Sequence, residues 1–174
     1  MLERFPVVVV VGVALLALGA CRDSGAEGEY FQVSSKLFVF NYRVATATYL
    51  VNLTAIQPAG DGETAVATFE NPAGGEPIVV RQKIWPKLAK TTIESPPLHC
   101  VVKNRPYAVS IRIESAEGAS KQVIETTMTS SEDQTLLPDA PLVVGPVYTP
   151  NPDLVGHPDG KLPGGTGVIC PSGT

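Results

Sequence analysis

The segment that most clearly indicates the fold is YAVSIRIE, residues 107–114. Its odd-numbered positions are Tyr, Val, Ile and Ile, whereas its even-numbered positions are small or polar. Side chains of a β-strand alternate between two faces, so this period of two predicts a strand with one buried face. A helix would scatter the same apolar residues around its circumference. The segment therefore predicts a protein built from β-sheets.

Similar patterns recur on both sides of this segment. They predict strands over residues 38–44, 49–54, 64–69, 78–85, 99–103 and 121–128, and a short strand over 91–93. Clusters of turn-forming residues separate these runs, at 58–62, 71–75, 95–97 and 116–118. Helical periodicity is not found beyond the first 21 residues, and one helical turn at 88–90 is the most we expect. About seven short strands with frequent turns predict an all-β antiparallel sandwich.

Two of these segments resemble parts of a fibronectin type III domain. Residues 69–78, FENPAGGEPI, resemble the turn between its second and third strands, with Phe69 where that family has Trp. Residues 107–111 resemble the strand with the family's corner tyrosine, and Val101 is the apolar residue six positions earlier. The resemblance implies an immunoglobulin-like or fibronectin type III-like sandwich in which the Tyr107 hydroxyl bonds to a nearby backbone group. It implies a fold and not a function.

The first 21 residues resemble the signal peptide of a bacterial lipoprotein. An apolar run of 12 residues covers positions 7–18, and about 20 would be needed for a helix to span a bilayer. The sequence Leu18-Gly19-Ala20-Cys21 resembles a lipobox, in which small residues admit the protease and the cysteine thiol accepts diacylglycerol. The resemblance implies cleavage after residue 20 and attachment to a membrane through lipid on Cys21. An ordinary signal peptide with a cysteine nearby is the alternative.

The residue after this cysteine bears on location. In enteric bacteria an Asp directly after the lipidated cysteine resembles an inner-membrane retention signal, and residue 22 is Arg. This favours the outer membrane of the bacterial envelope, with either face possible. We expect a signal peptide over residues 1–20, a flexible tether over 21–35, the sandwich over 36–148 and a proline- and glycine-rich tail over 149–174.

Prolines crowd the chain from residue 136 onward. Because Pro lacks a backbone donor, this predicts an extended, polyproline-like or disordered tail beyond residue 148. A strand near residues 142–144 could still pair at a sheet edge. The run 143–150 then has two interpretations: a strand that packs on its own sandwich, or an arm that adds to a partner's sheet edge.

The chain has three cysteines. If Cys21 carries lipid, Cys100 and Cys170 remain, and an exported protein meets an oxidising compartment where disulfides persist. An even remainder favours a Cys100–Cys170 bridge, with two free thiols as the alternative. The bridge would pin the tail to the sandwich.

Composition and motifs argue against several function classes. Removal of residues 1–20 leaves 12 Lys and Arg against 16 Asp and Glu, with no basic run, so we expect no nucleic-acid partner. The two histidines, His99 and His157, have no nucleophile or ligand set beside them, and the carboxylates are scattered. We therefore expect no catalytic residue, no metal site and no cofactor.

Two aromatic residues are candidates for contact with a partner or ligand. Trp85 is the only Trp and precedes Pro86; burial in the core is the favoured interpretation, and an exposed stacking platform is the alternative. Tyr148 lies in the proline-rich run. We expect a lipid-anchored, non-catalytic interaction or structural module with an envelope or surface protein as partner. A carbohydrate- or small-ligand-binding lipoprotein that uses Trp85, Tyr49 and Tyr148 as exposed stacking surfaces is the alternative.

Overall fold

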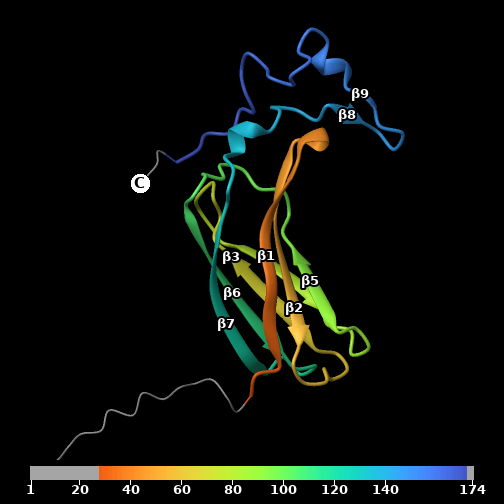
Figure 1. Cartoon of the computed structure of the whole chain (residues 1–174), viewed down its shortest axis with the longest axis vertical. Coiled ribbons are helices and arrows are strands. Elements are labelled where there is room, and N and C mark those ends of the chain that lie inside the picture. Colours follow the sequence, from red (N-terminus) through yellow and green to blue (C-terminus); the bar gives the residue numbers. More distant parts are fainter. Residues whose placement is uncertain (1–27, 172–174) are drawn as a thin grey trace, which may run out of the picture.

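The computed structural model describes residues 28–171 and is almost entirely β-structure (Figure 1). Cys21, the expected lipidation site, lies outside the described residues. The long strands are β1 (Phe31–Asn41), β2 (Thr46–Ala55), β3 (Thr64–Phe69), β4 (Ile78–Lys83), β5 (Lys90–Glu94), β6 (Pro106–Glu114) and β7 (Ser120–Thr129). The short elements are strands β8 (Val143–Val144) and β9 (Thr149–Pro150) and the 3-10 turns η1 (Tyr42–Val44), η2 (Gln134–Leu136) and η3 (Pro152–Leu154). The all-β prediction is confirmed.

The long strands form two antiparallel sheets that face each other. One sheet has the order β1-β2-β5 and the other β4-β3-β6-β7. β1 begins at one end of the sandwich, here called the N-terminal pole, where the loops 56–63, 84–89 and 115–119 also lie. At the other end, the cap pole, lie the loops 70–77 and 95–105 and the C-terminal segment (Figure 1). The molecule is therefore elongated along its strands.

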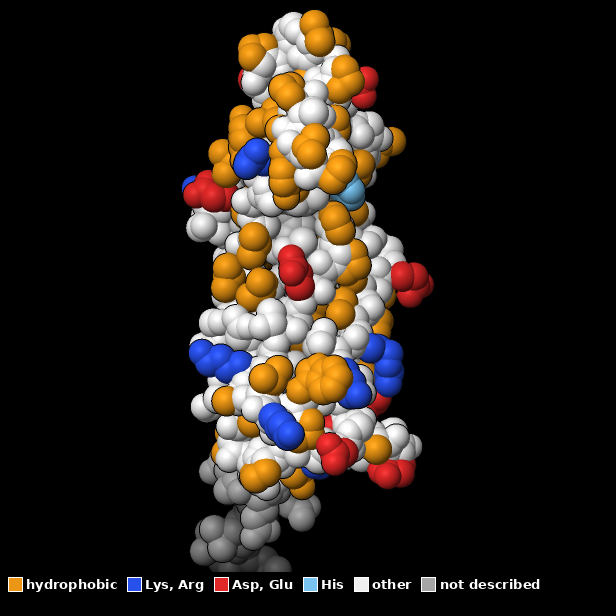
Figure 2. All heavy atoms as spheres, turned by 90° about the vertical axis from the view of Figure 1, so that its right-hand side faces the viewer, with side chains coloured by type: hydrophobic (Ala, Val, Ile, Leu, Met, Phe, Trp, Pro, Cys, Tyr) orange, Lys and Arg blue, Asp and Glu red, His pale blue; other side chains and the backbone are white. Residues whose placement is uncertain are grey.

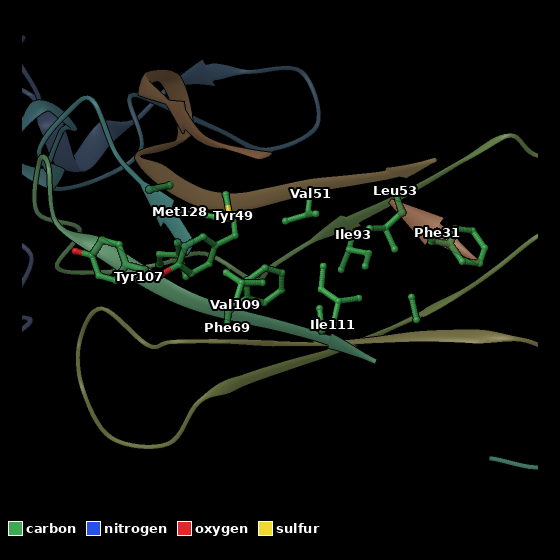
Figure 3. Packing of buried hydrophobic residues seen from close by; sticks show 14 of the residues in the cluster. Phe31, Tyr49, Val51, Leu53, Phe69, Ile93, Tyr107, Val109, Ile111 and Met128 are labelled. Atoms are coloured by element: carbon green, nitrogen blue, oxygen red, sulfur yellow. The ribbon is translucent and has the colours of Figure 1, made fainter. Parts of the chain in front are cut away.

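The alternation in residues 107–114 places one face of β6 in the core. Tyr107, Val109, Ile111 and Ile113 are buried, as predicted, and β3, which pairs with β6, has the predicted bounds. The two sheets enclose one hydrophobic core between them (Figure 3). Burial of apolar side chains stabilises the fold by roughly 25 cal/mol per Å² of area removed from water.

Aromatic side chains dominate the half of this core nearer the cap pole (Figure 3). The rings of Tyr49 and Phe69 stack with centroids 4.9 Å apart and planes 8° from parallel. Tyr107 meets Tyr49 edge-on at 6.2 Å. Phe69, which stands where the fibronectin type III family has Trp, is fully buried in this group. Burial raises the pKa of the Tyr49 hydroxyl, which stays neutral and donates to the Glu70 carbonyl at 3.0 Å.

The hydroxyl of Tyr107 forms the expected bond to a nearby backbone group. It accepts from the Val102 N–H at 2.7 Å, while its ring is fully buried and Val101 packs into the core. The guanidinium of Arg105 lies 4.5 Å from the centre of the same ring and pairs with Glu70 at 2.6 Å. Tyr107 thus joins the loop before β6 to the core.

The first strand starts earlier than the sequence predicts. It begins at Phe31, inside the expected tether, because residues 31–33 continue the pairing with β2. The register shifts between Val33 and Ser35, so inward-facing side chains are odd-numbered before this bulge and even-numbered after it. The bulge therefore interrupts the alternation of apolar and polar residues along β1. The strand ends at Asn41, before the predicted end at residue 44, because Tyr42–Val44 form η1.

The predicted strand over residues 99–103 is wrong. These residues belong to the loop that crosses from β5 in one sheet to β6 in the other, and they make only isolated bridges, such as Lys103 with Ser130. Cys100 and Asn104 have positive φ angles of 65° and 61°, which no strand accommodates. Two smaller corrections concern residues 78–90: β4 ends at Lys83, and Lys90 begins β5, not a helical turn.

We predict that Tyr107→Phe destabilises the domain by about 1 kcal/mol, because it leaves the partly buried Val102 N–H without its acceptor. Urea unfolding measures this loss. Tyr42→Phe is the matched control, since the Tyr42 side chain is exposed on η1, and its stability should equal that of the wild type. Equal stability of both variants would show that the Tyr107 hydroxyl contributes nothing.

Candidate functional site

The most unusual surface lies at the cap pole, where residues 134–171, here called the cap, fold over the end of the sandwich (Figure 1). The expectation of an extended or disordered tail is wrong. Successive backbone hydrogen bonds close turns from Asn151 to Leu154, from Leu154 to His157 and from His157 to Gly160. Side-chain oxygens also accept from the backbone two residues onward, as Asn151 does from Asp153. Such local bonds order a chain that has few apolar residues to bury.

The predicted Cys100–Cys170 disulfide is confirmed and pins the cap to the sandwich. The Cα atoms are 5.4 Å apart, and the bridge joins positions separated by 70 residues. The loop that carries Cys100 is held in turn by Gln134, whose backbone N–H donates to Val101 O at 2.8 Å. Both ends of the cap are therefore attached to residues 98–102.

Polar contacts fix the interior of the cap. The ammonium group of Lys161 donates to the carbonyls of Thr135 and Leu137 and lies 3.5 Å from Asp139. The buried Asn151 side chain donates to Pro141 O at 2.8 Å. Gly160 has a φ of 72°, and a Cβ there would lie 2.5 Å from the Pro138 side chain, so only glycine fits. These contacts give the cap one defined shape.

The strands β8 and β9 pair with each other and not with either sheet. Neither interpretation of residues 143–150 therefore describes this structure: the run forms a small hairpin within the cap. The turn between the strands exposes Val147 and Tyr148. Leu142, just before β8, donates its N–H to Arg43 O at 2.9 Å, and the Arg43 guanidinium lies 5.1 Å from the centre of the Tyr148 ring. The hairpin is thus fastened to η1.

Tyr148 has a positive φ of 54°, a conformation that costs a residue with a side chain roughly 1 kcal/mol. Asn or Gly would occupy this position at lower cost. The side chain is 59% exposed, and the core does not hold it. A strained backbone that presents an exposed aromatic ring favours a role for that ring in binding.

The outer surface of the cap is apolar and nearly uncharged (Figure 2). Only Asp139, Asp153, Asp159 and Lys161 are charged in this segment, and Lys161 pairs with Asp139. Val155 is 82% exposed and Ile169 93% exposed. The other exposed apolar side chains of the cap are Leu136, Val144, Val147, Tyr148 and Val168. The interpretation of the run 143–150 as a partner-binding arm includes Val144, Val147 and Tyr148, but the sequence analysis did not single out Leu136, Val155, Val168 or Ile169. The available signal for these was the scarcity of charge between 134 and 171.

An open hollow of about 1380 Å³ lies between the cap and the loops beneath it. Its lining combines the Glu70–Arg105 ion pair with the apolar side chains of Val168 and Ile169. The carboxylate of Glu70 is fully occupied, since it also accepts from the Ala108 N–H at 3.0 Å. The charges in the hollow therefore serve the structure beneath the cap.

The structure does not bring the two aromatic candidates together. Trp85 lies in the loop between β4 and β5, at the N-terminal pole, whereas Tyr148 lies at the cap pole. Trp85 is 52% exposed, so the favoured expectation of burial is wrong. Ile84 takes the inward position after β4, which directs the next side chain outward.

The buried carboxylates of the described chain are used in ion pairs. Glu114 pairs with Arg81 at 2.5 Å and with Arg112 at 2.8 Å, and hydrogen bonds from Arg112 and Arg81 lower the pKa of this carboxyl. Glu63 pairs with Lys121. Between residues 28 and 171, His, Cys, Asp and Glu side chains form no group of three that could hold a metal ion.

Comparisons with known proteins add no relative. No family model matches the chain, and no curated protein matches it. Within the described range, no helix is long and apolar enough to cross a membrane.

We predict that the double variant Cys100→Ala/Cys170→Ala loses the shape of the cap while keeping the sandwich. On the chain-entropy relation, the bridge stabilises the fold by roughly 4 kcal/mol, and its loss leaves hydrogen bonds and the burial of Leu137 and Leu154 to hold residues 134–171. Limited proteolysis with mass spectrometry should find new cleavage between 134 and 171 and an intact β1–β7. An unchanged cleavage pattern would contradict the importance of the bridge.

Proposed function

We propose that the protein is a lipid-anchored, non-catalytic interaction module of the bacterial envelope whose cap binds an envelope or surface protein. The observation that carries this proposal is the cap itself: an apolar, almost uncharged surface, covalently pinned at the pole opposite the start of β1. Anchoring is supported by the resemblance of residues 18–21 to a lipobox, which favours the outer membrane because Arg follows Cys21.

The geometry supports an anchor at the N-terminal pole and a binding surface at the cap pole. β1 has eleven residues and runs from the N-terminal pole toward the cap, so it separates them by roughly 35 Å at about 3.3 Å per residue. A protein anchored near residue 21 would present the cap on the side away from its anchor. A partner would meet the cap without displacing the domain from the membrane.

The character of the cap supports a protein as the partner. Charged residues are depleted in the centres of protein interfaces, and the cap shares this scarcity of charge. Several large apolar side chains, among them Val147 and Ile169, are exposed on it, as they are at interaction sites. The disulfide and the internal turns order the cap beforehand, so binding costs little conformational entropy.

The alternative, a carbohydrate site that uses Trp85, Tyr49 and Tyr148, has weaker support, because Tyr49 is fully buried in the core. Trp85 and Tyr148 lie at opposite poles and cannot line one site, and each ring already has a cationic neighbour. The ammonium of Lys83 lies 4.2 Å from the centre of the Trp85 ring. A sugar would have to displace these cations or bind the opposite ring face alone.

We also propose that the sandwich is of the fibronectin type III kind. Immunoglobulin constant domains place their fourth strand in the sheet of the first two, whereas β4 pairs with β3 in the other sheet. The bond between Tyr107 and the Val102 N–H fits a sandwich of this superfamily but does not distinguish the two kinds. This proposal concerns architecture and adds no activity.

A photo-crosslinking amino acid tests the role of the cap. Placed at Val147 or Ile169 in the full-length protein in its native membrane, it should give a discrete crosslinked protein on irradiation. Placed at Val79, an apolar position on β4 that is also more than half exposed, it should not. Absence of cap-specific products would contradict the proposed role of the cap.

Cys21→Ser tests the anchor separately. We expect this variant to lose incorporation of radioactive fatty acid and to leave the membrane fraction, because the thiol that would carry the lipid is gone. A variant of one of the other cysteines, Cys170→Ser, should retain the label. Equal labelling of wild type and Cys21→Ser would refute lipidation at this residue.

A further inference from the structure

The loop between β4 and β5 holds a rigid turn at the N-terminal pole. The Leu88 N–H donates to Trp85 O at 2.9 Å, and Pro86 occupies the second position, where its fixed φ favours the turn. Ile84 is fully buried just before the turn and anchors it to the core. Residues 85–88, here called the Trp85 turn, therefore hold their shape without help from a ligand.

The Trp85 turn lies beside the start of the described chain. The Ala55 N–H donates to Ala89 O at 3.1 Å, and the next residue, Ile56, donates to Tyr30 O at 2.8 Å. Only β2 separates the loop from Tyr30, and neighbouring strands are about 4.8 Å apart. The turn thus lies roughly 10 Å from Tyr30, where the chain leads back toward Cys21.

The turn exposes large apolar side chains in a basic setting. Trp85 and Leu88, the first and last residues of the turn, are both more than half exposed, and Ile56 on the adjacent loop is nearly so. Residues 77–93 contain Arg81, Lys83, Lys87 and Lys90 and no acidic residue, although the chain as a whole has a net charge of −4.

These cations are not equivalent. Arg81 is engaged by Glu114, and Lys83 lies over the indole ring, but Lys87 and Lys90 are exposed. Figure 2 shows basic and hydrophobic side chains side by side toward the lower end of this face, with acidic side chains at the lower border. The acidic residues of the adjoining segments are Glu29, Asp61 and Glu117, together with Glu63, which is buried and paired with Lys121.

The length of the chain outside the structure determines how far this pole can lie from an anchor. Six residues lie between Cys21 and Gly28, and a fully extended chain over these seven steps would reach only about 25 Å. A lipid on Cys21 would therefore keep the N-terminal pole close to the bilayer. Trp side chains favour the interface between water and lipid, and lysines are attracted to anionic headgroups over distances within a Debye length.

We infer that the Trp85 turn docks on the anionic headgroups of the membrane that holds the protein. This inference rests on the proposed anchoring through Cys21. Trp85 and Leu88 enter the interface, while Lys87 and Lys90 contact lipid phosphates. Docking of this pole holds the long axis of the sandwich away from the membrane and presents the cap to its partner.

The test uses the fluorescence of Trp85, the only Trp of the chain. Full-length protein extracted from its host membrane is reconstituted into vesicles of zwitterionic lipid, with or without phosphatidylglycerol, and with brominated acyl chains as quenchers. We expect a shift of Trp85 emission to shorter wavelength and quenching by bromine, both stronger with phosphatidylglycerol and weaker at high salt. Lys87→Gln/Lys90→Gln should lose most of the quenching. The matched control, Lys36→Gln/Lys103→Gln, removes two exposed cations elsewhere and should not.

The outcomes separate this inference from the proposed anchoring. A protein that floats with the vesicles while bromine leaves Trp85 unquenched would overturn the docking of the turn and leave the anchor intact. A protein that does not float with any vesicle would overturn both. A shift in emission that depends on protein density and not on lipid charge would assign the turn to a second copy of the chain, and would likewise overturn the inference.

Discussion

The hydrogen bond from the Val102 N–H to the Tyr107 hydroxyl joins the two parts of this protein. On one side it belongs to the core, because the Tyr107 ring is buried between the sheets. On the other side it holds a loop whose left-handed residue, Cys100, carries the disulfide to the cap. Gln134 binds the same loop through the backbone of Val101. The cap has a defined place because the crossover before β6 has one.

The parts of the fold that the sequence predicts well are those governed by burial. β3 and β6 pair with each other inside a sheet, so their alternation records one buried face without interruption. β1 was predicted only in part because the bulge between Val33 and Ser35 reverses which positions face inward. The strand predicted over residues 99–103 is wrong although Val101 and Val102 are apolar and β-branched. The positive φ angle of Cys100 turns the chain out of the extended conformation. The periodicity of apolar residues predicts which face of a strand is buried, but it does not predict the backbone φ angles.

Of the candidate site, only the disulfide could be predicted from the sequence. Cysteine parity indicated the bridge between Cys100 and Cys170, but nothing in the prolines of the cap indicated that Lys161 and Asn151 would organise it. These polar contacts join residues 10 to 26 positions apart, beyond the range of local patterns. Trp85 illustrates the same limit, because its exposure depends on where β4 ends. The surface of the cap and the exposure of Trp85 therefore depend on contacts and strand ends that local sequence patterns do not specify.

The pairing of β1 with β2 has a mechanical consequence. A domain held at its N-terminus and pulled at its cap bears tension along its strands, and the disulfide gives that tension a second, covalent path from the cap to Cys100. The β1–β2 hydrogen bonds run across this direction. The ten registered pairs from Phe31–Ala55 to Asn41–Thr46 are therefore sheared together and not unzipped one after another. Such an arrangement suits a link that must hold under sudden load.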